Sequence, residues 1–192
     1  THASVGSWEM PSALVKPAAT ESQQWFEHAA RPAGLKLVMT ESPWHIMQSI
    51  WRREKDFDEA YMQTDPPKKS LCVGYRGKYF KKEVQRLVDR FRFRKPEIVL
   101  FDVECFGSAG RGLADCARCA KIAKDRGMEP KALAGTLFAE AATDIADVLN
   151  AAADELGIPH PKIGYYQCGP GWIYHNVLDF DKLYPTAAQI SN

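Results

Sequence analysis

Residues Glu97–Gly107 read "EIVLFDVECFG", and this stretch decides the fold. Four apolar residues, 98–101, follow one another without a polar residue between them. A strand that is covered on both faces has such a continuous apolar run, whereas a half-exposed strand alternates apolar and polar residues. Asp102 and Glu104 come directly after the run, separated by one valine. The stretch therefore predicts a buried parallel strand that ends in two carboxylates.

Helix and strand patterns alternate on both sides of this strand. Before it, the apolar residues of 78–91 recur at helical spacing, and Pro96 ends that helix just before the strand begins. Further strands are predicted at 35–42, 71–77 and 162–168, and further helices at 21–34, 44–53, 114–127, 130–156 and near 180–190. The helical connections are long enough to join parallel strands.

This alternation predicts an α/β fold with parallel strands, and we interpret it as a TIM-like (β/α) barrel. Four convincing strands do not fill the eight positions of such a barrel. Either weaker strands lie near the N-terminal arm and in the stretch 169–177, "GPGWIYHNV", or the barrel is partial. A flavodoxin-like open sheet is the alternative.

Length and composition fit one folded domain. The chain has 192 residues, of which 45% are hydrophobic and 26% charged. Residues 1–20 are predicted as an irregular arm and residues 21–192 as a single catalytic-type α/β domain. The net charge of +1 favours no nucleic-acid partner, and no apolar run reaches the about 18 residues that cross a bilayer, so no membrane partner is expected. The basic run 90–95, "RFRFRK", is interpreted as a solvated helix end, and no pattern indicates the oligomeric state.

The two carboxylates after the buried strand point to a reaction class. Side chains two residues apart in a strand project from the same face, so Asp102 and Glu104 are expected to face one cavity about 6 to 7 Å apart. Neighbouring carboxyl groups raise each other's pKa and separate their protonation states. One group then holds a proton while the other stays charged, which suits the cleavage of a glycosidic bond.

The strand also resembles a known signature. "IVLFDVE" resembles the strand that carries the Asp-x-Glu motif in TIM-barrel glycoside hydrolases of the chitinase type and of the fungal and bacterial lysozyme type. The resemblance implies that Glu104 is the general acid and that Asp102 assists the reactive centre. Chitinase strands carry further Asp and Gly residues upstream, where this chain has Ile98, Val99 and Leu100, so the resemblance is to the broader class.

A glycoside hydrolase that cleaves a polysaccharide or glycan is therefore the expected function. The expected substrate is a carbohydrate, with no cofactor and no metal ion, and a secreted or periplasmic location is favoured for such an enzyme. The alternative is a non-catalytic barrel that binds a carbohydrate or a protein. In a structural interpretation, Asp102 caps the following loop or pairs with Arg76, and Glu104 is a solvated strand end.

Candidate substrate contacts lie at the ends of the other predicted strands. Sugar rings stack on flat aromatic side chains, and polar side chains bind their hydroxyl groups. Tyr166 and Gln167 are the preferred polar partners of a substrate. The full set of candidates is Glu41, Trp44, His45, Tyr75, Arg76, Tyr165, Tyr166, Gln167 and Trp172.

The five cysteines leave a second possibility open. Cys116 and Cys119 form a Cys-x-x-Cys motif, which serves as a redox pair, as half of a zinc site, or as two small apolar residues on a helix. A zinc site needs further ligands, and Cys105, Cys168 and His160 supply them only if folding brings them together. A thiol-disulfide or zinc protein is thus a further alternative.

Overall fold

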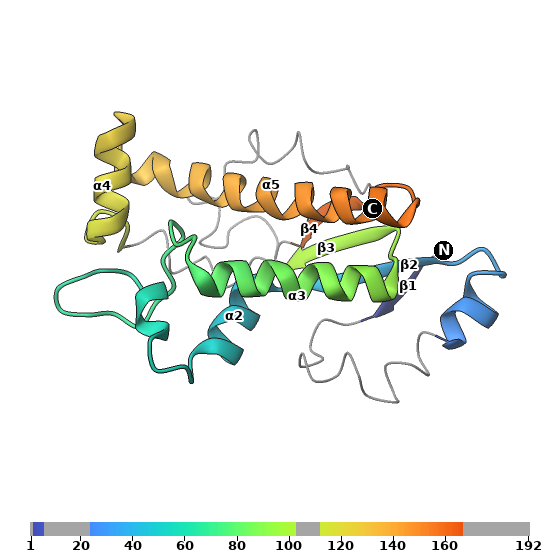
Figure 1. Cartoon of the computed structure of the whole chain (residues 1–192). Helices are drawn as coiled ribbons and strands as arrows, with labels where there is room; N and C mark the ends of the chain where they lie inside the picture. Colours follow the sequence, from blue (N-terminus) through green and yellow to red (C-terminus); the bar gives the residue numbers. More distant parts are fainter. Residues whose placement is uncertain (1, 6–23, 103–111, 167–192) are drawn as a thin grey trace.

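The structure, a computed structural model, describes residues 2–5, 24–102 and 112–166 (Figure 1). Within these ranges, the side chains of residues 2–5, 45, 46, 48, 49, 102, 131 and 166 are not described. The strands are β1 (His2–Val5), β2 (Lys36–Glu41), β3 (Ile98–Asp102) and β4 (Lys162–Tyr166). The helices are α2 (Pro43–Trp51), α3 (Lys78–Arg94), α4 (Ala117–Arg126) and α5 (Pro130–Leu156), with two short helical turns, η2 (Phe26–Ala30) and η3 (Phe57–Ala60).

The described strands form one parallel sheet in the order β1-β2-β3-β4. Val99 of β3 is the register partner of Met39 of β2 and of Ile163 of β4, so β3 is hydrogen-bonded on both sides. This confirms the predicted α/β fold with parallel strands. The sheet is open over the described strands, and its sequential order lacks the reversal that a flavodoxin-like sheet contains.

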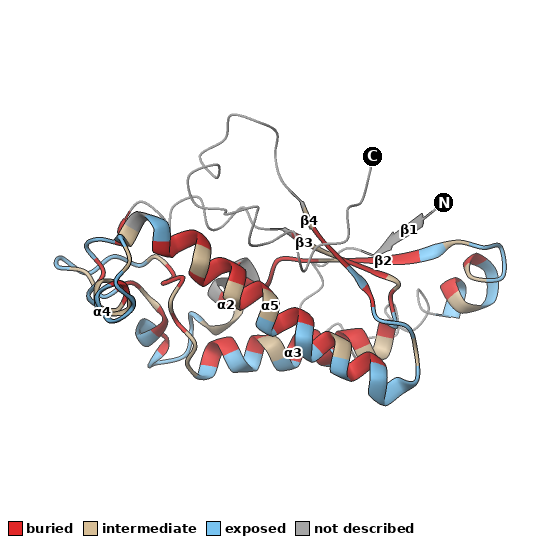
Figure 2. Ribbon diagram, turned by 90° about the horizontal axis from the view of Figure 1, so that it is seen from above, coloured by how far each residue is buried: buried red, intermediate tan, exposed pale blue. Residues whose placement is uncertain are grey.

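Helices α3 and α5 lie side by side across one face of this sheet (Figures 1 and 2). Val99 and Phe101 of β3 belong to the core cluster that these helices form with the sheet. Alternation along the strand places Ile98 on the opposite face, and Ile98 is also buried, at 6% exposure. The strand is therefore fully buried on the helix side and, on the opposite face, buried at Ile98 and half-buried at Leu100.

The chain supplies clear signals for the two long helices. In α3, Tyr79, Leu87 and Phe91 are buried on one face, and Lys95 ends the helix in a left-handed conformation just before Pro96. In α5, a proline occupies the first turn and Gly157 ends the helix with a φ of +64°. Both helices match the ranges predicted from sequence.

The segment 71–77 corrects the prediction of a second strand. Leu71 makes only an isolated antiparallel bridge with Tyr61, and the Tyr75 N–H donates to the Cys72 carbonyl at 3.0 Å, which closes a turn. Cys72, Val73 and Tyr75 are buried in the core cluster that also contains side chains of α4 and α5. The apolar residues of this segment are thus explained by packing against helices and not by a place in the sheet.

The N-terminal segment holds a strand where an irregular arm was predicted. His2–Val5 form β1, whose residues pair in parallel with Lys36–Met39 of β2. The predicted elements at 35–42, 44–53, 114–127 and 162–168 correspond to β2, α2, α4 and β4. The helix predicted at 21–34 is confirmed over a short stretch that ends at Ala30, and the one near 180–190 lies outside the described residues.

A buried network of ions joins α3 to the end of β2. The Glu41 carboxylate lies 2.7 Å from Arg86 and 2.7 Å from Arg90, and all three side chains are buried. Arg86 also donates to both carboxylate oxygens of Glu83, at 2.7 to 3.0 Å. Arg90 and Arg94 are only 1% and 2% exposed, which corrects the interpretation of the run 90–95 as a solvated helix end.

Glu83 makes the stability of the fold depend on pH. Burial raises the pKa of Glu83 to about 7, and Arg86 opposes the rise. Because the group titrates near 4.5 in the unfolded chain, the folded protein holds the extra proton between about pH 4.5 and about pH 7. The stability that this proton contributes is full below that interval and is lost as the pH rises through it.

We therefore expect the free energy of unfolding of the wild type to fall, relative to Glu83→Gln, between about pH 5 and about pH 8. Urea denaturation at several pH values measures this difference. A difference that stays constant over the interval would show that Glu83 is ionised in the fold throughout.

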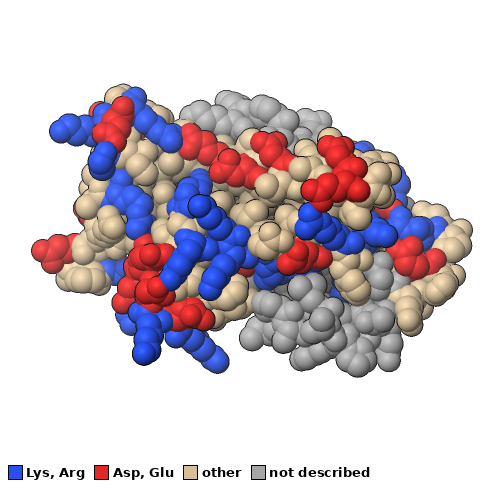
Figure 3. All heavy atoms as spheres, viewed as in Figure 1, with Lys and Arg blue, Asp and Glu red and all other residues tan. Residues whose placement is uncertain are grey.

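The described surface carries both signs of charge. Acidic side chains gather along α5, and basic side chains gather along α3 and around α4 (Figure 3). Ion pairs connect these helices, such as Arg126 with Glu140 at 2.6 Å and Arg92 with Glu155 at 2.5 Å. Among the described residues, no helix combines the length and the apolar character that a membrane crossing requires.

Candidate functional site

The carboxyl end of β3 lies at an interior position of the sheet. Asp102 is the last residue of β3, and its register partner in β4 is Tyr166. Strand alternation gives Asp102 a position on the face shared by Ile98 and Leu100, opposite the helices α3 and α5. The side chains of Asp102 and Tyr166 are not described, and Glu104, Gln167 and Trp172 lie outside the described residues.

Three of the predicted substrate contacts lie on the helix side of the sheet instead. Glu41 is fully buried and is engaged by the arginines of α3. Trp44 is 3% exposed, with its ring 4.8 Å from that of Phe138, and Tyr165 lies 6.2 Å from the same ring. Glu41 and Trp44 are buried, which corrects the expectation that they line an open site, and the half-buried Tyr165 packs against the core. His45 follows Trp44 in α2, and its side chain is not described.

Tyr75 and Arg76 are also engaged within the protein. Tyr75 is buried and its hydroxyl donates to Glu59 at 2.5 Å, while burial raises the pKa of this tyrosine to about 12. Arg76 donates to the carbonyls of Val73 and Leu137 at 2.8 and 2.6 Å. Neither residue lies at the end of a strand, because the strand predicted at 71–77 does not form. Arg76 pairs with Asp144. Its predicted pairing with Asp102 is not tested, because the side chain of Asp102 is not described.

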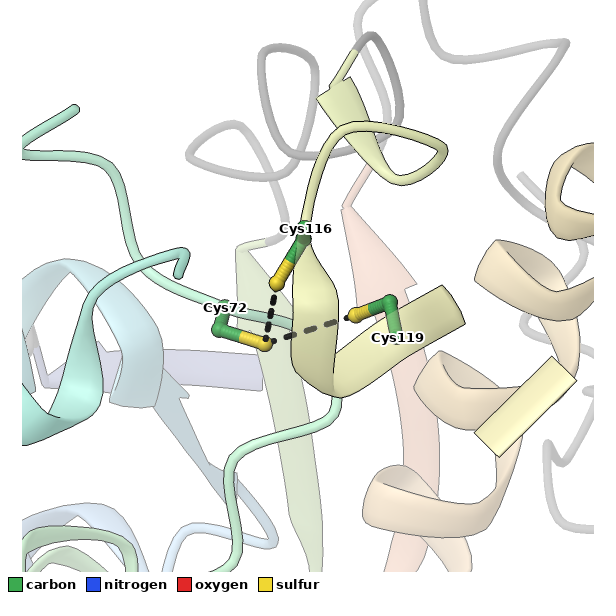
Figure 4. Close-up of side chains that lie close together, drawn as sticks. All are labelled: Cys72, Cys116 and Cys119. Carbon is green, nitrogen blue, oxygen red and sulfur yellow. Dashed lines mark hydrogen bonds between the residues drawn. The ribbon is translucent and has the colours of Figure 1, made fainter. Parts of the chain in front are cut away.

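A second arrangement brings three cysteines together, and we call it the cysteine cluster: Cys72, Cys116 and Cys119 (Figure 4). Figure 4 shows the side chains of Cys116 and Cys119 directed toward Cys72. The Cys72 Sγ lies 3.8 Å from the Cys116 Sγ and 3.4 Å from the Cys119 Sγ. All three are free thiols and are buried. Among the residues that the structure describes, these are the side chains grouped in a way that suits a metal ion.

Local backbone geometry places the three thiols. Cys116 is the residue that precedes α4, and Cys119 lies in the first turn of that helix. The Ala117 N–H donates to the Gln63 carbonyl at 2.8 Å, and the Gln63 N–H donates to the Cys116 Sγ at 3.4 Å. These reciprocal bonds attach the start of α4 to the segment that carries Cys72.

The thiols differ in acidity because they share hydrogen bonds. Hydrogen bonds from Cys119 and Cys72, with help from the Gln63 backbone N–H, lower the pKa of Cys116 well below its usual value. The hydrogen bond with Cys116 raises the pKa of Cys119 and also that of Cys72. Cys116 is therefore the most acidic of the three thiols.

Sequence patterns indicated two members of this cluster and missed the third. The Cys-x-x-Cys spacing identified Cys116 and Cys119, but Cys72 lies 44 residues before Cys116 and has no local motif. His160, considered as a ligand, instead pairs with Asp154 at 2.8 Å and is exposed. Cys105 and Cys168 lie outside the described residues.

Comparison of the chain with models of protein families, with curated proteins and with solved structures gives no match. Two arrangements of its own residues thus bear on function. They are the carboxyl end of β3, where Asp102 stands, and the cysteine cluster.

Proposed function

We propose that the chain is a glycoside hydrolase in which Glu104 protonates the leaving oxygen and Asp102 stabilises the positive centre. The observation that supports this most is the position of Asp102 at the carboxyl end of β3, a strand that is hydrogen-bonded to β2 and to β4. In parallel α/β folds the loops that follow the strands converge at this edge, and binding sites form there.

The proposal includes a TIM-like barrel of which β1 to β4 are one part. Strands that follow one another in sequential order, with their helices on one face, are arranged as in such a barrel. The face opposite α3 and α5 is then the inner face, and Asp102 has an inner position at the end where barrel enzymes act.

The chemistry follows from two carboxyl groups on one strand. A protonated carboxyl donates its proton to the glycosidic oxygen as the bond to the sugar breaks. A neighbouring carboxylate stabilises or attacks the positive centre that remains, and water completes the hydrolysis. In this proposal Glu104 holds the proton and Asp102 the charge, because neighbouring carboxyl groups raise each other's pKa.

The proposed substrate contacts are Tyr166 and residues that follow β4 in the chain. Tyr166 is the register partner of Asp102 in β4, and Gln167 and Trp172 follow it in the chain. Their hydroxyl, amide and indole groups suit the hydroxyl groups and the flat faces of a sugar.

The direct test is to incubate the purified chain with a panel of polysaccharides and to measure new reducing ends, with binding measured in parallel. We expect turnover of at least one polysaccharide. Binding without release of reducing ends would instead establish the non-catalytic carbohydrate-binding alternative. Neither binding nor turnover would contradict both.

A further inference from the structure

The three sulfurs of the cysteine cluster are spaced like ligands of one metal ion. Tetrahedral Zn–S bonds of about 2.3 Å separate two ligand sulfurs by about 3.8 Å. The two measured separations are 3.8 and 3.4 Å, and all three sulfurs lie within 4.8 Å of one another. A disulfide needs about 2.0 Å, so no pair in the cluster is at bonding distance.

Burial of the cluster argues against a redox role. Cys72 is 4% exposed, Cys119 is 1% exposed and Cys116 is not exposed at all. Thiol-disulfide exchange requires a thiolate that a second sulfur can reach, whereas structural metal sites are closed. A Cβ added to Gly74 would lie 3.5 Å from the Cys119 Sγ and 3.1 Å from Ile122, so this side of the cluster has little free space.

The surroundings also favour the ionised form of the ligands. Cys116 and Cys119 stand at the amino-terminal end of α4, where backbone N–H groups and the helix dipole stabilise negative charge. The Gln63 N–H points at the Cys116 sulfur from the other segment. Arg118, which donates to the Glu59 carbonyl at 2.6 Å, supplies a positive charge beside the cluster. Three thiolates and a divalent ion have a net charge of minus one, which Arg118 offsets.

We propose that Cys72, Cys116 and Cys119 bind one Zn²⁺ ion as thiolates and that this ion fastens the segment 57–76 to the start of α4. The three thiolates leave the fourth tetrahedral position to a ligand outside the cluster. Each thiol releases its proton to solvent when the Zn–S bond forms, and no electron is transferred. The site is structural and does not depend on the proposed hydrolysis.

The ion would stabilise the folded chain because it joins residues that lie far apart in the sequence. Cys72 is separated from Cys116 by 44 residues and from Cys119 by 47, so the ion closes two long loops of the chain. Cross-links between distant residues remove conformational freedom from the unfolded chain. They also attach the segment that follows α2 to the helix that follows β3, on the side of the sheet where the strands end (Figure 1).

The first test is metal analysis of the purified, untagged chain, by mass spectrometry of the elements. We expect one zinc per chain, and we expect removal by a chelator with a reductant to lower the Tm by on the order of 10 °C. Titration of the metal-free chain with Co²⁺ should produce the thiolate-to-cobalt charge-transfer band and the visible bands of a tetrahedral ion.

The second test uses Cys72→Ser with Ala117→Ser as its matched control. Ala117 is exposed and lies in the first turn of α4, as Cys119 does. The change at Ala117 therefore introduces a hydroxyl group next to the cluster without removing a ligand. We expect Cys72→Ser to lose the zinc and the cobalt bands, and Ala117→Ser to keep both. Should Cys72→Ser fail to fold, the cobalt spectrum and the zinc content of the wild type still decide the proposal.

A disulfide between any two of the three cysteines in the protein as purified would overturn the proposal. So would a metal-free chain that binds neither Zn²⁺ nor Co²⁺ under reducing conditions. Equal zinc content in Cys72→Ser and in the wild type would also overturn it, because the ion would then be bound elsewhere.

Discussion

Glu104→Gln should lower the rate of polysaccharide cleavage by about 10²- to 10⁴-fold while the fold stays intact. The amide has nearly the shape of the carboxyl group but carries no transferable acidic proton, so the leaving oxygen departs unprotonated. The measurement is the initial rate of release of reducing ends, at equal concentrations of folded protein judged by circular dichroism. Equal rates for the variant and the wild type would contradict the assignment of Glu104.

The leaving group provides a sharper form of this test. An aryl glycoside with a very acidic leaving group needs little protonation, so Glu104→Gln should retain much more of the wild-type rate on it than on a polysaccharide. Glu155→Gln is the control, because Glu155 is an exposed carboxylate in the last turn of α5 that pairs with Arg92 of α3. An equal loss on both substrates would indicate that Glu104 positions the substrate and is not the acid.

Glu41→Ala should lower the free energy of unfolding by about 3 to 5 kcal/mol. Glu41 is the fully buried partner of Arg86 and Arg90, at 2.7 Å from each, and its removal leaves buried guanidinium groups without this carboxylate. Urea denaturation followed by circular dichroism measures the change, with the slope of the transition compared to check that unfolding remains cooperative.

The matched control for this prediction is Glu155→Ala. Its ion pair with Arg92 is exposed, so its loss should cost about 0 to 1 kcal/mol. A change in Glu41→Ala as small as that of the control would mean that the buried network is not required for the fold. It would also reopen the earlier expectation that Glu41 serves a substrate.

The fold was predictable from sequence wherever the pattern is local. The continuous apolar run of β3 and the helical spacing of α3 both depend on near neighbours, and both elements form as predicted. The segment 71–77 has the same apolar character, but Gly74 and the turn between Cys72 and Tyr75 shape it for contact with helices. The residues that it packs against belong to α4 and α5. The sequence of the segment alone does not indicate these contacts.

The site was less predictable because its residues meet only in the folded chain. Glu41 is the last residue of a strand, where a substrate ligand would lie, yet it faces α3 and its arginines. Arg86, Arg90 and Arg94 recur every four residues along one face of α3, and this spacing was the signal of a buried network. Cys72 has no such signal, because the residues it meets follow 44 and 47 positions later.

The most direct measurement of the proposed site is covalent labelling with an oligosaccharide that carries an epoxide in place of the leaving group. A carboxylate in the site opens the epoxide and becomes esterified, and tryptic mapping then locates the ester. We predict the ester on Asp102 or Glu104 in the peptide 95–111. Fragmentation of this peptide distinguishes them from Glu97, its third carboxylate residue. Glu97 lies at the other end of β3, where it accepts hydrogen bonds from Arg31 and from the Leu37 N–H. An ester on a carboxylate outside this peptide, or inhibition without any ester, would contradict the assignment of the site to the carboxyl end of β3.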